Sequence, residues 1–135
     1  MKLTHHGAHE GVTGSCHQLN WGDGHGLLVD CGIFQGDEAR KHPNPEINFP
    51  LTNIESLLLT HVHIDHAGRI PYLLAAGFDQ PIYCSHPTAK LLPLVMEDAL
   101  KIGFTRSRKL ISRFLEQVKH LLQPVEYDTW HPISG

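Results

Sequence analysis

The sequence predicts an α/β fold with a mixed sheet and helices packed on it. Three observations support this: short apolar runs that suit strands, later stretches with helical spacing, and a chain order that begins with strands and then alternates strands and helices. The chain has 135 residues, 41% hydrophobic and 19% charged. This composition excludes a disordered, collagenous or coiled-coil chain. We therefore expect a single unit over residues 1–135, with no second domain.

The first half of the chain contains four predicted strands. Three are expected at Lys2–His5, Ser15–Asn20 and Leu27–Asp30, with a Gly- and Asp-rich turn joining the last two. Residues 36–50 contain three prolines, which suit neither a ladder nor a helix, so a surface loop is expected there. The apolar run Ile54–Thr60 fits a buried strand, although periodicity alone leaves a helix open.

Helices dominate the second half. One is expected at Gly68–Ala76, followed by a strand at Pro81–Ser85 and a helix at Pro87–Ile102 with a kink or break near Pro93. The clearest helical periodicity covers Ser107–Leu122, and a proline two residues later is expected to stop that helix. The remaining residues form no predicted element.

Composition also limits where the protein works. No apolar run approaches the roughly 18 residues of a membrane span, and no secretory signal is expected at the N-terminus. Cys16, Cys31 and Cys84 form no CxxC pair, which favours reduced thiols in a cytoplasmic protein. The chain has 12 His against 11 Lys and Arg, so we ask whether the histidines are scattered or grouped.

Three of these histidines gather in HVHIDH, residues 61–66, directly after the apolar run. Side chains two apart on an extended chain face the same way, so His61 and His63 are expected to converge on one metal. Asp65 and His66 lie where the chain turns into a helix and are expected to face a second metal. Two close divalent ions acidify a bridging water, and Asp65 is the expected proton acceptor. The alternative is a His-rich surface loop without ligands.

THVHIDHAG, residues 60–68, resembles the HxHxDH signature of the metallo-β-lactamase superfamily. Together with GVTGSCHQL, LLVDCGIFQG and HIDHAGRIPYL, it is similar to the N-terminal part of the β-CASP RNA-processing nucleases, over about Leu3 to Ile102. The resemblance implies the first half of the αββα metallo-β-lactamase sandwich. It also implies a ribonuclease, exo- or endonucleolytic, with two Zn²⁺ ions in the complete enzyme and RNA as substrate.

The resemblance assigns roles by position. His61 and His63 match ligands of one zinc, and Asp65 and His66 match ligands of the other. Asp30 matches a carboxylate that orients a metal-binding histidine. Without the resemblance, an Asp that ends a strand at a tight turn is an equally good interpretation of this residue. Asp65 and Asp30 are thus the predicted catalytic residues. Two ligands per zinc fall short of three, so we expect the isolated chain to be inactive, with a missing C-terminal half or a homodimer.

A basic stretch offers a second candidate interface. Arg106, Arg108, Lys109 and Arg113 suit contacts with RNA phosphates, or simply the solvated face of an amphipathic helix. The backbone N–H groups of residues 13–15 suit a phosphate or a tight turn. Two other functions stay open: a hydrolase of thioesters or other esters with the same fold, and a non-catalytic binding or assembly module.

Overall fold

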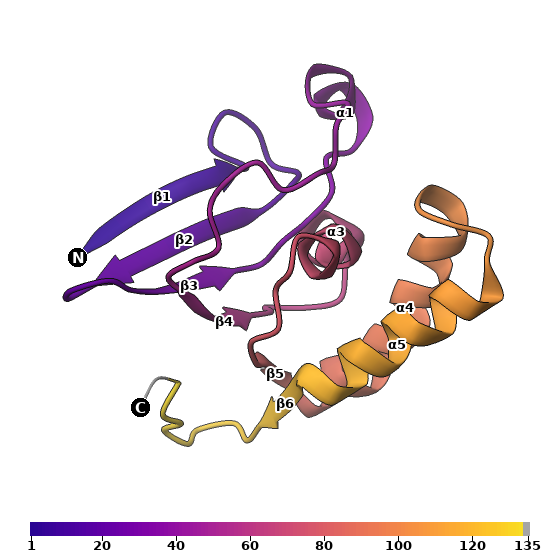
Figure 1. Cartoon of the computed structure of the whole chain (residues 1–135). Coiled ribbons are helices and arrows are strands. Elements are labelled where there is room, and N and C mark those ends of the chain that lie inside the picture. The colour runs from indigo at the N-terminus through magenta and orange to yellow at the C-terminus, as the bar shows by residue number, and fades with distance from the viewer. Residues whose placement is uncertain (134–135) are drawn as a thin grey trace.

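A computed structural model describes residues 1–133 and contains a six-stranded mixed sheet. The strands follow one another across the sheet in chain order, as Figure 1 shows: β1 (Lys2–Gly7), β2 (Cys16–Trp21), β3 (His25–Val29), β4 (Ile54–Leu58), β5 (Ile82–Ser85) and β6 (Leu122–Val125). The first three are antiparallel, and the pairs from β3 to β6 are parallel. The predicted α/β class with a mixed sheet is confirmed, in keeping with a partial metallo-β-lactamase fold. The end of the predicted unit, residues 134–135, lies outside the described residues.

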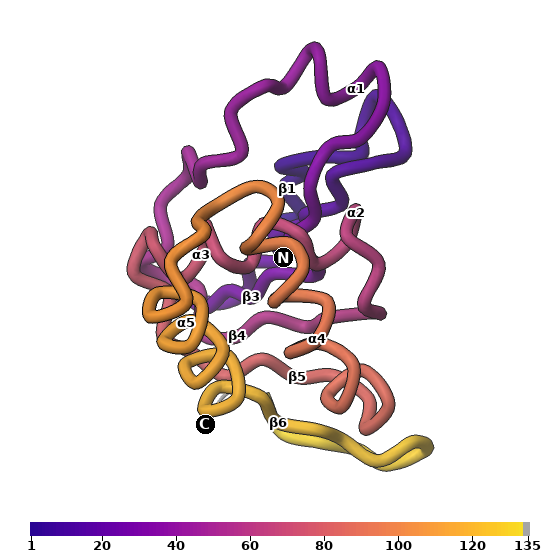
Figure 2. Tube along the Cα trace, turned by 90° about the vertical axis from the view of Figure 1, so that its right-hand side faces the viewer, coloured from indigo at the N-terminus to yellow at the C-terminus, as the bar shows by residue number. Residues whose placement is uncertain are grey.

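The helices lie mainly in the connections between the parallel strands. They are α1 (Gly36–Lys41), α2 (Ile64–Ala67), α3 (Ile70–Ala75), α4 (His86–Gly103) and α5 (Arg108–Leu121). Connections between parallel neighbours are almost always right-handed, and here they all step in one direction across the sheet. As a result α3, α4 and α5 stack on the same face, which is turned toward the viewer in Figure 2.

The hydrophobic core lies between that face and the helices. Leu28 of β3 stands opposite Leu57 of β4, which in turn pairs with Ile82 of β5, and all three are fully buried. Leu73 of α3 and Met96 of α4 cover them from the helix side. Each such side chain contributes roughly 1.5–3 kcal/mol by leaving water. This core fixes the strand ends from which the candidate site emerges.

Two local expectations are wrong because they gave proline too much weight. Gly36–Lys41 form α1 within the expected loop, since the prolines come only after it. Its acidic first turn and basic last turn complement the helix dipole. Helix α4 continues through Pro93 without a break. The buried residues Leu92 and Met96 pack the helix on the core on either side of the proline, and this packing offsets the lost backbone hydrogen bond.

The last strand, β6, was also missed. Pro124 does end α5 early, but the residues around it pair in parallel with β5. A proline is compatible with an edge strand, because its missing N–H can face away from the neighbouring strand. Since β1 and β6 form the two edges of the sheet, Pro124 lies where a strand tolerates it.

The three cysteines are free and buried. The hydrogen bond that the Cys31 thiol donates to Cys16, and then burial, raise the pKa of Cys31 well above its ordinary value, and burial raises the pKa of Cys84 to about 11. Such thiols are poor nucleophiles. No helix within residues 1–133 is both long enough and apolar enough to cross a bilayer.

Candidate metal centre

The HVHIDH segment leads from β4 into the short helix α2. Because β4 ends at Leu58, His61 and His63 follow the strand instead of belonging to it, and the backbone of His63, with φ −57° and ψ 142°, is still extended. The imidazoles still come together. The ring centroid of His61 lies 4.8 Å from that of His63 and 4.1 Å from that of His66. His61 and His63 thus lie side by side as expected, and the turn into α2 adds His66 to the pair.

Two neighbouring loops hold the backbone of this segment. The N–H groups of Ser15, Cys31 and Ile33 donate to the carbonyls of Asp65, His66 and Ile64, at 2.8–2.9 Å. Gly32 approaches so closely that an added Cβ would lie 1.6 Å from the carbonyl oxygen of Asp65. No side chain fits there. The glycine therefore allows the loop after β3 to pack directly against the candidate ligands.

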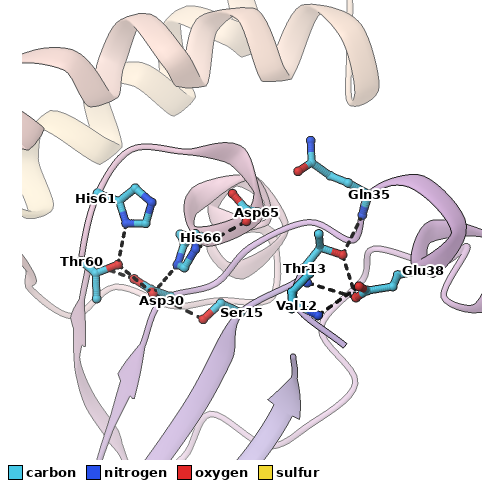
Figure 3. A network of polar contacts seen from close by, with 10 residues as sticks. All are labelled: Val12, Thr13, Ser15, Asp30, Gln35, Glu38, Thr60, His61, Asp65 and His66. Carbon is cyan, nitrogen blue, oxygen red and sulfur yellow. Dashed lines mark hydrogen bonds and ion pairs between the residues drawn. The ribbon is translucent and has the colours of Figure 1, made fainter. Parts of the chain in front are cut away.

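Asp30 is the centre of the polar network drawn in Figure 3. It is 2% exposed. One carboxylate oxygen, Oδ2, accepts from Nδ1 of His66 at 2.7 Å and from the hydroxyl of Thr60 at 2.9 Å, and Oδ1 accepts from the N–H of Thr60 at 2.8 Å. An ionised carboxylate can only accept, so Nδ1 of His66 carries the proton. The lone pair of His66 is then on Nε2, the tautomer that a metal ligand needs.

The four predicted ligands are neighbours but do not surround one point. Nε2 of His66 is 3.5 Å from Oδ2 of Asp65, while Nδ1 of His61 contacts the Thr60 hydroxyl at 2.9 Å, and His63 is exposed. Among residues 1–133, no three His, Cys, Asp or Glu side chains are gathered closely enough to hold an ion. Three imidazoles and a carboxylate nevertheless suit Zn²⁺. The donors fit a divalent ion in kind, and binding requires their side chains to move.

A second network, around Glu38, was missed because α1 was expected to be a loop. The Glu38 carboxylate accepts from the N–H groups of Val12 and Thr13, both at 3.0 Å, and from the Thr13 hydroxyl at 2.8 Å (Figure 3). These contacts, with that of Val12 first, lower the pKa of Glu38. The N–H groups of Thr13 and Ser15 are thus already used, by Glu38 and by the carbonyl of Asp65. Both groups therefore bind partners far along the chain instead of closing a tight turn, and binding of a phosphate there is not supported by this arrangement.

Arg69 is a further contributor that the sequence alone did not indicate. It is 4% exposed, and its backbone N–H and Nε donate to the carbonyls of Cys31 and Gly32. Its guanidinium lies 5.5 Å from the ring centroid of Phe34, a contact worth about 0.5–2 kcal/mol. Arg69 thereby ties the loop after Asp30 to the chain that follows the HVHIDH segment.

The predicted basic residues lie on another part of the molecule. Arg108, Lys109 and Arg113 belong to α5, and Arg106 precedes it; all four are exposed. Helix α5 packs on α4, which borders α3 (Figure 1). The expected amphipathic helix is confirmed, since Ile111, Val118 and Leu121 are buried. A role of the basic face in binding RNA stays a prediction.

Comparisons with known proteins agree with this arrangement. The profile of the family described as the metallo-beta-lactamase superfamily matches residues 11–135. Ribonuclease TTHA0252 of Thermus thermophilus is 39% identical over 96% of the chain and 29% of its own length. Transcription termination factor FttA of Methanosarcina mazei is 30% identical over 95% of the chain and 21% of its own length. Integrator complex subunit 11 of Danio rerio is 35% identical over 76% of the chain and 18% of its own length.

The chain thus spans less than a third of the length of these relatives. They are β-CASP RNA-processing nucleases, the branch that the three sequence segments indicated. The matched region contains the HVHIDH segment, Asp30 and the strands that position both. The family match covers most of the residues and the whole candidate centre, and the chain belongs to the metallo-β-lactamase superfamily.

Proposed function

We propose that this chain is part of a metal-dependent hydrolase that cleaves RNA phosphodiesters, with the HVHIDH segment in its metal centre. The observation that carries the proposal is the buried pair of Asp30 and His66, at 2.7 Å. Burying a carboxylate that is 2% exposed is costly, and its bond to Nδ1 of His66 selects the metal-ligating tautomer of that ring. RNA is proposed as the substrate because a relative of this chain is named a ribonuclease.

Each residue of the centre has a proposed role. His61 and His63 would hold one Zn²⁺ ion, and Asp65 and His66 a second. When bound, the ions supply an acidified water for attack on a phosphodiester. Asp65 accepts the proton, and Asp30 keeps His66 oriented. Two protein donors per ion are fewer than the three of typical catalytic zinc sites, so we propose that further ligands join from outside these residues and that the chain alone binds zinc weakly and is inactive.

Three further proposals concern the surroundings of the enzyme. Arg106, Arg108, Lys109 and Arg113 are proposed to contact RNA phosphates, with an affinity that falls steeply with salt. Cytoplasmic localisation is proposed from the three reduced, buried thiols. Self-association of the isolated chain is proposed because β1 and β6 are open edges and the apolar side chains of Leu3 and Trp130 are exposed.

One observation favours hydrolysis of acyl thioesters as a second candidate. A hollow of about 270 Å³ lies between α4 and the segment α2–α3, and its lining is almost entirely apolar. Ile64, which belongs to the HVHIDH segment, is part of this lining together with Tyr72 and Phe104. An acyl chain suits such a wall, whereas a phosphodiester backbone does not. Comparing the turnover of RNA and of an acyl thioester by the same preparation separates the two candidates.

The proposal is tested with Asp65→Ala in the full natural polypeptide, by measuring ribonuclease turnover with zinc supplied. The loss of a ligand and proton acceptor is expected to lower turnover by about 10²–10⁴-fold. Asp79→Ala is the matched control, because Asp79 is an exposed carboxylate in the loop before β5, outside both the centre and the hollow. Unchanged turnover in Asp65→Ala rejects the catalytic assignment. Zinc binding without turnover of RNA or thioester supports a non-catalytic binding module instead.

A further inference from the structure

A pair of histidines outside the candidate centre lies on the N-terminal hairpin. His5 of β1 and His17 of β2 stand directly opposite each other in the antiparallel register, so their side chains leave the same face of the sheet. Their Nδ1 atoms are 2.8 Å apart, and the ring centroids are 4.9 Å apart at an interplanar angle of 83°. His5 is exposed and His17 half-buried. Within residues 1–133 neither ring forms an ion pair with a carboxylate.

We propose that His5 and His17 chelate a divalent late first-row transition-metal ion, Cu²⁺ or Ni²⁺, through their two Nδ1 atoms. The pair shares no ligand with residues 61–66, although His17 lies near enough for the charges of Asp30 and His66 to affect its pKa, and it does not depend on the function proposed for them. The two imidazoles supply two adjacent coordination positions, and water supplies the others. The hairpin already holds the two nitrogens close together. The two side chains therefore lose little further conformational freedom when an ion binds.

The separation of the nitrogens favours these ions over tetrahedral Zn²⁺. Two nitrogens about 2.0 Å from an ion are about 2.8 Å apart when they subtend the right angle of tetragonal geometry, and about 3.3 Å apart at the tetrahedral angle. The 2.8 Å between His5 and His17 is the length of their hydrogen bond, and an ion in place of the shared proton keeps the two rings at this separation when it takes the right angle. Square-planar and tetragonal nitrogen sites are typical of Cu²⁺ and Ni²⁺, and Cu²⁺ is the tightest binder of the series.

Protonation also suits chelation. A contact of 2.8 Å between two ring nitrogens requires one N–H to donate to the other, so the pair holds a shared proton that a metal ion replaces. Burial first, and then the neighbouring His5, lower the pKa of His17, so its ring is mainly neutral at neutral pH. His6 takes no part, because it lies on the other face of β1, where it stacks on Phe49 and contacts Gln18.

The test is titration with Cu²⁺ and with Ni²⁺, followed by calorimetry and by the imidazole nitrogen resonances. His61→Ala/His63→Ala/Asp65→Ala is the background, because it breaks both ligand pairs proposed for residues 61–66 and so keeps that centre from accounting for the result. In this background we expect one bound ion per chain, broadened or shifted resonances of His5 and His17, and loss of the ion in His5→Asn and His17→Asn. His9→Asn, in the exposed loop after β1, is the matched control and is expected to keep it.

Urea unfolding provides a second measurement. An ion that bridges β1 and β2 binds only the folded hairpin, so saturating Ni²⁺ is expected to raise the unfolding midpoint of the background protein and of His9→Asn, but not of His5→Asn. The proposal is overturned if His5→Asn and His17→Asn bind the ion as tightly as the background. It is also overturned if the background protein itself binds none.

Discussion

Replacing Asp30 by Asn tests whether the buried carboxylate keeps the proton of His66 on Nδ1, which leaves the lone pair on Nε2 for a metal. The amide keeps the shape of the side chain and, like aspartate, tolerates the left-handed backbone at φ 61°. Its carbonyl can still accept from the N–H of Thr60, but its NH₂ group now faces Nδ1 of His66. The imidazole must then accept at Nδ1 and carry its proton on Nε2, which removes the lone pair that a metal needs.

The magnitudes follow from the contacts of Asp30. Losing one charge-assisted hydrogen bond to His66 is expected to lower the free energy of unfolding by about 1.5–3 kcal/mol in Asp30→Asn. Loss of the orienting group is expected to weaken metal binding by about 10–100-fold. Asp30→Ala should cost more, about 3–5 kcal/mol, because it leaves the N–H of Thr60 and the imidazole of His66 without their acceptor. Alanine also tolerates the left-handed backbone poorly.

Three measurements decide the outcome: urea unfolding, zinc affinity by competition with a chelator, and the ring nitrogen shifts of His66. Glu55→Gln is the matched control, because Glu55 contacts the exposed His25 at 2.6 Å. Glu55→Gln is expected to lower the free energy of unfolding by less than about 1 kcal/mol and to leave the zinc affinity unchanged. If Asp30→Asn keeps the proton of His66 on Nδ1 and binds zinc like the original chain, the reasoning about Asp30 is wrong.

Further predictions concern a glycine, a pH-dependent contact and the core. Gly32→Ala is expected to unfold the HVHIDH segment or the whole chain, because its Cβ would overlap the carbonyl of Asp65; circular dichroism and urea unfolding measure the loss. The pKa of Glu38 is lowered in the folded chain, so its stabilisation is present above the ordinary carboxyl pKa and is lost as the pH falls through the lowered value. Glu38→Gln should therefore weaken the fall of the unfolding free energy as the pH becomes acidic. An unchanged pH dependence contradicts this role of Glu38. Met96→Ala empties a fully buried position and should cost about 2–5 kcal/mol in urea unfolding, against little for the exposed Leu94→Ala.

Much of the secondary structure could be predicted because it depends on neighbours within a few residues. Helix α5 shows apolar residues at helical spacing, and Ser107, whose hydroxyl accepts from the N–H of Leu110, marks its start. The strands around Leu28 and Leu57 show as apolar runs. Proline misled the prediction at α4 and β6, since a single sequence does not tell whether packing offsets a missing N–H or whether a strand lies at an edge.

The candidate ligands could be predicted from the sequence for a similar reason. They are His61, His63, Asp65 and His66, which lie within six residues. Their partners do not follow from spacing: the family resemblance assigned Asp30 to orient a metal-binding histidine without saying which one, and nothing indicated Glu38 or Arg69. Asp30 is 36 residues away from His66, and Glu38 is 25 residues away from Thr13. Arg69 follows the motif closely, yet its contacts are to the loop after β3. Such contacts depend on the register of parallel strands and on the path of the crossovers, which local patterns do not encode.

The sequence by itself determined the α/β class, most helices and strands, and the segment that we propose as the metal site. Each of these follows from residues close in the chain, through periodicity or ligand spacing. Only the tertiary structure decided that Asp30 reaches His66, that Gly32 admits no side chain, and that His5 meets His17. Those contacts join distant residues, and they form only once the hydrophobic core has set which strands lie side by side and in which register.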